Sequence, residues 1–160
     1  MKSPFEDLQI NSELVCEFAA VFMRFEYAMK ASDYCAGDRW HNAVPNWKLL
    51  KDDLGMKLDQ LQDMEVQQAI QCLLKDPPQV QKFLDGRPGF QQTPLLGATE
   101  GAKALEAAKR VRNNLFHGGK HTPHSPPERD TRLLEASFVV LRACLALNKE
   151  LASEYEHQIV

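Results

Sequence analysis

Apolar residues recur at steps of three and four positions along nearly the whole chain, and this periodicity limits the fold more than any other feature. The first such segment runs from about Asn11 or Ser12 to Ala31. Its apolar positions form one helical stripe: Val15, Phe18, Phe22, Phe25 and Met29. No apolar–polar alternation is long enough to predict a strand. The sequence therefore predicts an all-α fold, an up-and-down helical bundle of about four long helices with one or two short ones.

Turn-rich stretches separate the other expected helices. These helices cover Trp47 to about Leu61, Met64 to Leu74, Thr99 to Phe116 or His117, and Glu128 to about Glu156. A short helical turn is expected over 79–84. The stretch 85–99 is expected to be the longest loop, because it holds two prolines and three glycines. Gly118 and Gly119 would end the fourth long helix.

Length and composition indicate one ordinary globular domain over residues 1–160. The chain is 44% hydrophobic and 26% charged, and its formal charge is −3. This charge argues against a protein that coats nucleic acid or anionic membrane by bulk attraction. The four cysteines form no C-x-x-C pair, so we expect reduced thiols in the core. A cytoplasmic protein with no membrane segment is expected, because neither a secretion signal nor a long apolar run is apparent.

The charge is unevenly distributed along the chain. Residues 101–121 contain five basic side chains and one acidic side chain, a local charge of +4, which leaves −7 for the rest. One basic groove on an acidic body would suppress indiscriminate binding while leaving a focused phosphate site.

The basic segment also carries residues suited to phosphate chemistry. On a helical projection, Asn113, His117 and Arg110 fall opposite the apolar stripe, and so would face away from the core. Asn113 and His117 lie four residues apart, so the amide can hydrogen-bond the imidazole and hold one tautomer. Histidine can transfer a proton near neutral pH, and arginine can hold phosphate oxygens. A solvated polar face is the plain alternative for this pattern.

Arg112 differs from these residues because it falls near the apolar stripe of its helix. A guanidinium is costly there unless it is paired. Glu26 lies inside the apolar stripe of the first helix and could supply the carboxylate. We therefore predict an Arg112–Glu26 ion pair between the two helices. A purely structural pair, which holds two helices in register, is the alternative to a functional one.

The stretch Arg112-Asn113-x-x-x-His117, late in a helix and followed by glycines, resembles the R-N-x-x-x-H signature of HEPN (higher eukaryotes and prokaryotes nucleotide-binding) domains. The broader family pattern, arginine and histidine separated by four to six residues, is also met by Arg110. Phe25-Glu26-Tyr27 is similar to the first-helix segment of such proteins, which often carries an acidic residue. The resemblance covers most of the chain in helix order and these two segments in residues.

This resemblance implies a helical bundle that forms a homodimer, with the motifs facing one another at the interface, and a metal-independent endoribonuclease activity. His117 would transfer the proton, Arg112 would contact phosphate or anchor the site, and Asn113 would orient its neighbours. Attack by the RNA 2′-hydroxyl would leave a 2′,3′-cyclic phosphate. Arg110, Asn114 and Lys120 are candidates for contacts to RNA phosphates. A toxin paired with a nucleotidyltransferase-type antitoxin is one role that the resemblance suggests.

Three alternatives remain open from the sequence. A non-catalytic HEPN module would bind nucleotide or a protein partner, and a purely structural helical domain would do neither. A metal site at His117, His121, His124 and Glu128 is disfavoured, because their spacing crosses a loop rich in glycine and proline. No metal or cofactor is therefore expected.

Overall fold

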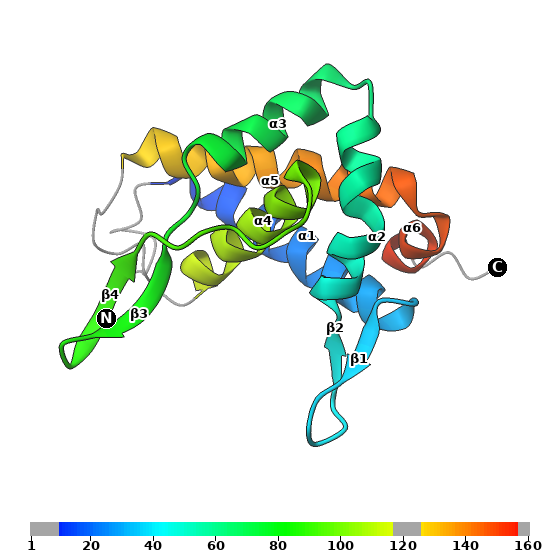
Figure 1. The fold of residues 1–160 in the computed structure, drawn as a ribbon, viewed down its shortest axis with the longest axis horizontal. Coiled ribbons are helices and arrows are strands. Elements are labelled where there is room, and N and C mark those ends of the chain that lie inside the picture. Colours follow the sequence, from blue (N-terminus) through cyan, green and yellow to red (C-terminus); the bar gives the residue numbers. More distant parts are fainter. Residues whose placement is uncertain (1–9, 117–125, 157–160) are drawn as a thin grey trace.

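The computed structural model describes residues 10–116 and 126–156 and places them in a largely helical fold (Figure 1). Of these residues, 67% lie in six helices, and two small antiparallel hairpins complete the described secondary structure. The helical class predicted from periodicity is confirmed. The strands are a minor addition that the sequence analysis did not predict.

The helix boundaries agree closely with the expected ones for the first four helices. They are α1 (Ser12–Ala31), α2 (Trp47–Gln60), α3 (Met64–Lys75), α4 (Glu100–Phe116), α5 (Pro127–Leu147) and α6 (Lys149–Glu156). Side-chain caps fix three of the starts. Asn11 accepts from the backbone N–H of Glu13 and Leu14, while Asn46 and Asp63 cap α2 and α3 in the same way.

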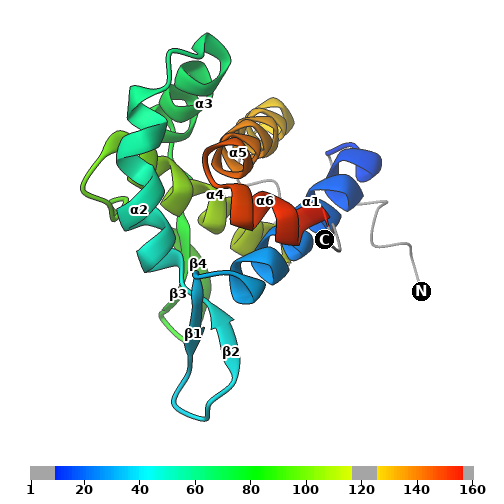
Figure 2. The same ribbon diagram turned by 90° about the vertical axis from the view of Figure 1, so that its right-hand side faces the viewer.

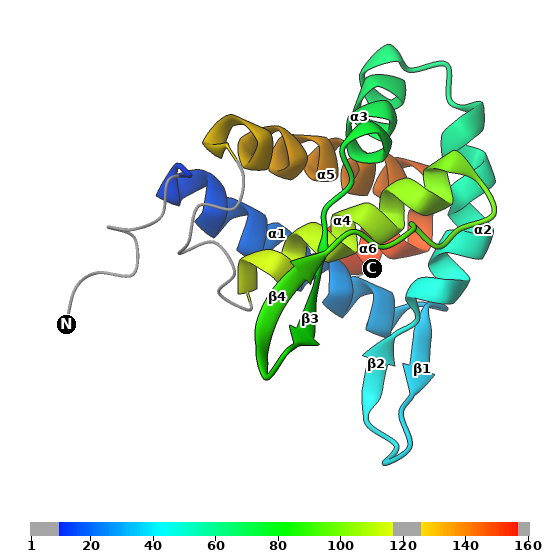
Figure 3. The same ribbon diagram turned by 60° about the vertical axis from the view of Figure 1, so that its left-hand side comes forward.

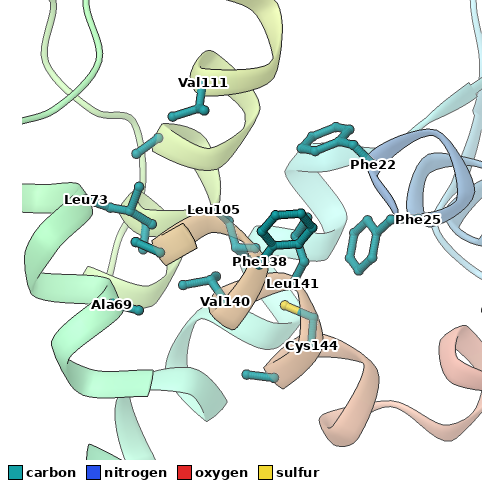
Figure 4. Packing of buried hydrophobic residues seen from close by; sticks show 14 of the residues in the cluster. Phe22, Phe25, Ala69, Leu73, Leu105, Val111, Phe138, Val140, Leu141 and Cys144 are labelled. Carbon is teal, nitrogen blue, oxygen red and sulfur yellow. The ribbon is translucent and has the colours of Figure 1, made fainter. Parts of the chain in front are cut away.

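Helices α4 and α5 lie in the middle of the molecule. Helix α4 packs against α2, α3 and α5, whereas α1 packs mainly against α6 at the other side of α5 (Figure 2). The phenylalanine stripe of α1 enters this core beside Phe138 and Leu141 of α5 (Figure 4). A close helix crossing sets the position of α4, because a Cβ at Gly101 would overlap the carbonyl oxygen of Gly55 in α2.

The prediction of a single helix from Glu128 to Glu156 is wrong, because the helix is interrupted at Asn148. The Asn148 Oδ1 accepts from the Leu151 N–H at 2.9 Å and thereby caps α6. Its Nδ2 donates to the Tyr34 hydroxyl at 2.8 Å, and that hydroxyl donates to Asp53. Burial and the Asp53 carboxylate raise the pKa of Tyr34, so the phenol stays protonated and keeps this donor role. The break turns α6 back onto α1.

The expectation for residues 79–99 is also wrong in part, because two strands form there. Strands β3 (Val80–Leu84) and β4 (Arg87–Gln91) pair around a two-residue turn. Asp85 and Gly86 have φ of 49° and 82° in that turn, as an Asp-Gly type I′ hairpin requires. A second hairpin joins β1 (Cys35–Gly37) to β2 (Ala43–Pro45). Both hairpins project from the same side of the helical body (Figures 1 and 3).

The cysteines differ in their surroundings: the expectation of core thiols holds for Cys144 and in part for Cys72, which is half-buried against the core, and it is wrong for the other two. Cys144 is fully buried, and burial raises the pKa of its thiol, whereas Cys16 and Cys35 are exposed. Within the described part of the chain, no helix is both long enough and apolar enough to cross a membrane.

Candidate functional site

The carboxyl-terminal half of α4 carries most of the predicted site residues and distributes them over two sides of the helix. Arg112 points towards α1, while Arg110, Asn113 and Asn114 face β3 and the segment before α4. His117 and Lys120 lie outside the described residues, so the predicted Asn113–His117 hydrogen bond stays a prediction.

The predicted ion pair between Arg112 and Glu26 is confirmed. The Arg112 Nη2 donates to Glu26 Oε1, and the two side chains are only 20% and 21% exposed. The pair joins α4 to α1, two helices separated by most of the chain. Glu26 faces inward because it lies one turn after the buried Phe22, and Arg112 does so because it lies one turn after the buried Ala108. The mutual neutralisation offsets the cost of placing both charges there.

A third residue, Trp47 at the start of α2, completes this cluster. Its Nε1 donates to the same Glu26 oxygen at 3.0 Å, and its ring stacks on Phe22 with centroids 5.5 Å apart. The Arg112 guanidinium carbon lies 5.1 Å from the Phe22 ring centroid, in cation–π range. We call Glu26, Trp47, Phe22 and Arg112 the anchor cluster.

The contact between Trp47 and Glu26 was not predicted from the sequence, although a signal for it was present. A buried indole N–H needs an acceptor, and Glu26 was already identified as a carboxylate in an apolar stripe. What the sequence could not supply was the packing of the α2 start against α1.

One donor of the anchor cluster is left over. The Nε–H of Arg112 is buried and has no hydrogen-bond partner among the described residues. A buried polar group without a partner is costly, on the order of 1–3 kcal/mol, and such groups concentrate at functional sites.

The placement of Arg110 corrects the helical projection. Arg110 was expected to face away from the core, but its side chain is only 8% exposed. Its Nη1 and Nη2 donate to the carbonyl oxygens of Thr93 and Pro94 at 2.7 and 2.6 Å. The guanidinium is therefore committed to the segment that precedes α4, which leaves Arg112 as the better match to the arginine of the motif.

Asn114 is likewise committed to the backbone. It is buried, and its Nδ2 donates to the Gln79 carbonyl oxygen at 2.8 Å, which ties the start of β3 to α4. Asn113 is half-buried, and within residues 10–116 and 126–156 its amide has no hydrogen-bond partner. Among the described residues, Asn114 is thus the amide that holds β3 in place, whereas Asn113 makes no such contact.

A polar pocket lies where β3 meets α4. Its volume is about 170 Å³, and we call it the amide pocket after the residues that line it: Gln79, Val80, Gln81, Arg110, Asn113 and Asn114. Charged side chains of α2 and α4 form a triad beside this pocket. Glu106 pairs with Lys51 at 2.8 Å and with Arg110 Nε at 3.5 Å, so this triad keeps one net positive charge beside the pocket. The pocket can therefore hold a polar group and favours a partial negative charge.

No group of three or more His, Cys, Asp or Glu residues in the described part of the chain could hold a metal ion. The predicted loop with His121 and His124 lies outside that part.

Comparisons with models of protein families, with curated proteins and with solved structures find no match to this chain. The functional conclusion therefore rests on the two clusters around α4.

Proposed function

We propose that this protein is a metal-independent endoribonuclease of the HEPN type that acts as a homodimer in the cytoplasm. One observation carries the proposal. The two segments that resemble the family meet in space, because Glu26 of α1 pairs with Arg112 of α4 directly before Asn113. A functional pair of this kind explains why charged residues are kept in two apolar stripes.

In this mechanism His117 removes the proton from the RNA 2′-hydroxyl, and the resulting oxygen attacks the adjacent phosphorus. The bond to the 5′-oxygen of the next nucleotide breaks, which leaves a 2′,3′-cyclic phosphate and a free 5′-hydroxyl after protonation. Arg112 stabilises the charge that develops on the phosphate oxygens, because its guanidinium keeps its positive charge and its pairing with Glu26 holds it in place. Glu26 positions Arg112, and Asn113 orients His117.

The exposed apolar side chains near the anchor cluster support a dimer with the site at its interface. Met23 and Tyr27 are exposed on α1 on either side of Glu26 in sequence, and Phe116 is exposed one turn after Arg112. Exposed apolar residues that lie together are typical of protein–protein contacts. A second copy of the chain would cover them and bring two motifs together.

A cleavage assay tests the proposal. Purified protein is incubated with mixed RNA in EDTA, and wild type is compared with His117→Ala and with His124→Ala as a matched control. We expect cleavage by wild type and by the control, and a loss of about 10²- to 10⁴-fold in His117→Ala. Cleavage that survives in His117→Ala would contradict the mechanism. The role as a toxin is tested by expression in cells with and without a nucleotidyltransferase-type antitoxin.

A non-catalytic module that binds nucleotide or a protein partner is the second candidate. The amide pocket favours it, because this pocket offers hydrogen-bonding groups without needing His117. Absence of cleavage on every RNA, together with saturable nucleotide binding, would favour this function over the first.

A further inference from the structure

We infer that the amide pocket and the β3–β4 hairpin form a binding site for single-stranded RNA, in which one base enters the pocket and a neighbouring base stacks on Phe83. This inference rests on the proposed function for its ligand, because the same half of α4 would hold the scissile phosphate. It adds a site for the bases that adjoins the R-N-x-x-x-H residues and shares only Asn113 with them.

The pocket has the size and chemistry of a site for a single base. At about 170 Å³ it is smaller than the roughly 300–1,000 Å³ typical of pockets for drug-sized ligands. Three residues that line the pocket, Gln79, Gln81 and Asn113, carry side-chain amides, and each amide has a donor next to an acceptor. Amides of this kind pair in bidentate fashion with adenine, whereas guanine is preferred by arginine. Because Arg110 donates to Thr93 and Pro94, adenine is the expected base.

The hairpin extends this pocket with an aromatic face. Cross-strand partners share a face, so Gln81 lies on the same side as Phe90, and Phe83 on the same side as Pro88. Gln81 and Phe83 are two residues apart and thus point to one face, about 7 Å apart along the strand. Since Gln81 lines the pocket, the face with Phe83 continues outward from it, alongside the carboxyl-terminal half of α4 (Figure 3).

Phe83 is available as a stacking platform. Its side chain is 80% exposed, the largest exposed fraction among the large hydrophobic residues of the described chain. An aromatic ring held on a projecting hairpin contributes little to the core, but it offers a flat face to an unpaired base.

The charge on the hairpin matches an RNA backbone. Lys82 and Arg87 lie on the opposite face from Phe83, near the tip, and both are exposed. Neither has an ion-pair partner within the described ranges 10–116 and 126–156, so both charges are available to phosphates. Asp85 in the turn leaves a net charge of +1 on β3, β4 and their turn.

A binding experiment tests the inference in the His117→Ala background, where the RNA stays intact. The probe is a fluorescent single-stranded adenylate hexamer, and binding is followed by anisotropy. We expect Phe83→Ala to weaken binding roughly 5- to 100-fold, as loss of one stacked base does. Gln81→Ala should weaken it by a smaller factor, and Phe83→Trp should restore it, because an aromatic ring is retained.

The β1–β2 hairpin provides a matched control. Trp40 is 64% exposed there, so Trp40→Ala removes an exposed aromatic side chain from the other hairpin and should leave the affinity unchanged. A double-stranded RNA of the same length should bind weakly, since its bases are not available for stacking. Circular dichroism and thermal unfolding verify that each variant is folded.

The outcomes separate this inference from the proposed function. Cleavage by wild type together with unchanged hexamer binding in Phe83→Ala and Gln81→Ala would overturn the base site and leave the ribonuclease standing. Hexamer binding that depends on Phe83, in a protein that cleaves no RNA, would support the base site and reject the ribonuclease. Equal losses in Phe83→Ala and Trp40→Ala, or no binding by the parent protein, would also overturn the inference.

Discussion

Arg110 and Arg112 lie two residues apart in α4; Arg110 is buried and Arg112 is partly buried, each for a different reason. Arg110 shares the Glu106 carboxylate, one turn away, with Lys51 and donates to two carbonyl oxygens of the preceding segment. Arg112 reaches across to α1, where a carboxylate and an aromatic ring hold it, and it keeps one donor unpartnered among the described residues. The comparison teaches that burial alone does not identify a functional arginine. What distinguishes the two is whether all donors are committed to the fold.

The largest effect is expected on the Arg112 side of α4. Glu26→Ala leaves a buried guanidinium and an indole N–H without their acceptor, and should lower the free energy of unfolding by about 2–4 kcal/mol. Because the side chains are one-fifth exposed, the loss should fall below that of a fully buried pair. Urea unfolding measures this effect.

A double variant sharpens the same test. Glu26→Leu combined with Arg112→Leu should recover much of the stability lost in either single variant, since no uncompensated charge remains. Strictly additive losses would contradict the assignment of the pair as the dominant interaction of the anchor cluster.

On the opposite side, Arg110→Met should cost about 2 kcal/mol in unfolding free energy, because the carbonyls of Thr93 and Pro94 lose a charged donor. Hydrogen exchange should rise locally in residues 92–99, whereas the amides of α1 should be unaffected. Arg110→Lys serves as the control for charge. It keeps the positive charge of the side chain, but one ammonium group cannot reproduce the forked donors of the guanidinium. Faster hydrogen exchange of the α1 amides in Arg110→Met would show that the contacts on the two sides of α4 do not act independently.

A smaller effect is expected from Trp47→Phe. This variant keeps an aromatic ring against Phe22 but removes the N–H that donates to Glu26, so about 1 kcal/mol of stability should be lost. Trp40→Phe, an exposed change of the same kind, should lose nothing measurable. Thermal unfolding of the two variants gives the comparison, and equal stabilities would remove Trp47 from the anchor cluster.

The smallest effect concerns pH and the Arg129–Asp76 pair, which holds the α3 end and Pro77 against α5. The Arg129 hydrogen bond lowers the pKa of Asp76 in the folded protein. Asp76 therefore stabilises the fold above its unfolded pKa of about 4, and this contribution is lost as pH falls through the lowered folded pKa. The Asp76 side chain is 60% exposed, so the contribution should stay under about 1 kcal/mol.

The variant Asp76→Asn isolates this pH dependence. Its stability should match that of wild type in acid and fall below it at neutral pH, because only the ionised carboxylate benefits from Arg129. Urea midpoints measured between pH 2 and 7 test the expectation. An undiminished pH dependence in the variant would assign the acid sensitivity to other carboxylates.

Much of the helical framework follows from local sequence. Asn11, Asn46 and Asp63 precede periodic segments and cap them, as their short polar side chains favour. The β3–β4 hairpin escaped prediction because its strands are short and do not alternate cleanly. Its Asp85-Gly86 turn was the available signal. The break at Asn148 has a local signal in the capping side chain of Asn148, but its hydrogen bond to Tyr34, more than a hundred residues earlier, could not be predicted from a local pattern.

The sequence by itself determined the helical class and one long-range contact of the site. Glu26 and Arg112 each interrupt an apolar stripe, and two opposite charges forced into one core must meet. Only the tertiary structure decided the other side of α4. A helical projection assumes one buried face, but the 92–99 segment and β3 cover the second face of α4 as well. Arg110 and Asn114 are therefore buried with backbone partners, and Asn113 is left beside a pocket that no single helix could have revealed.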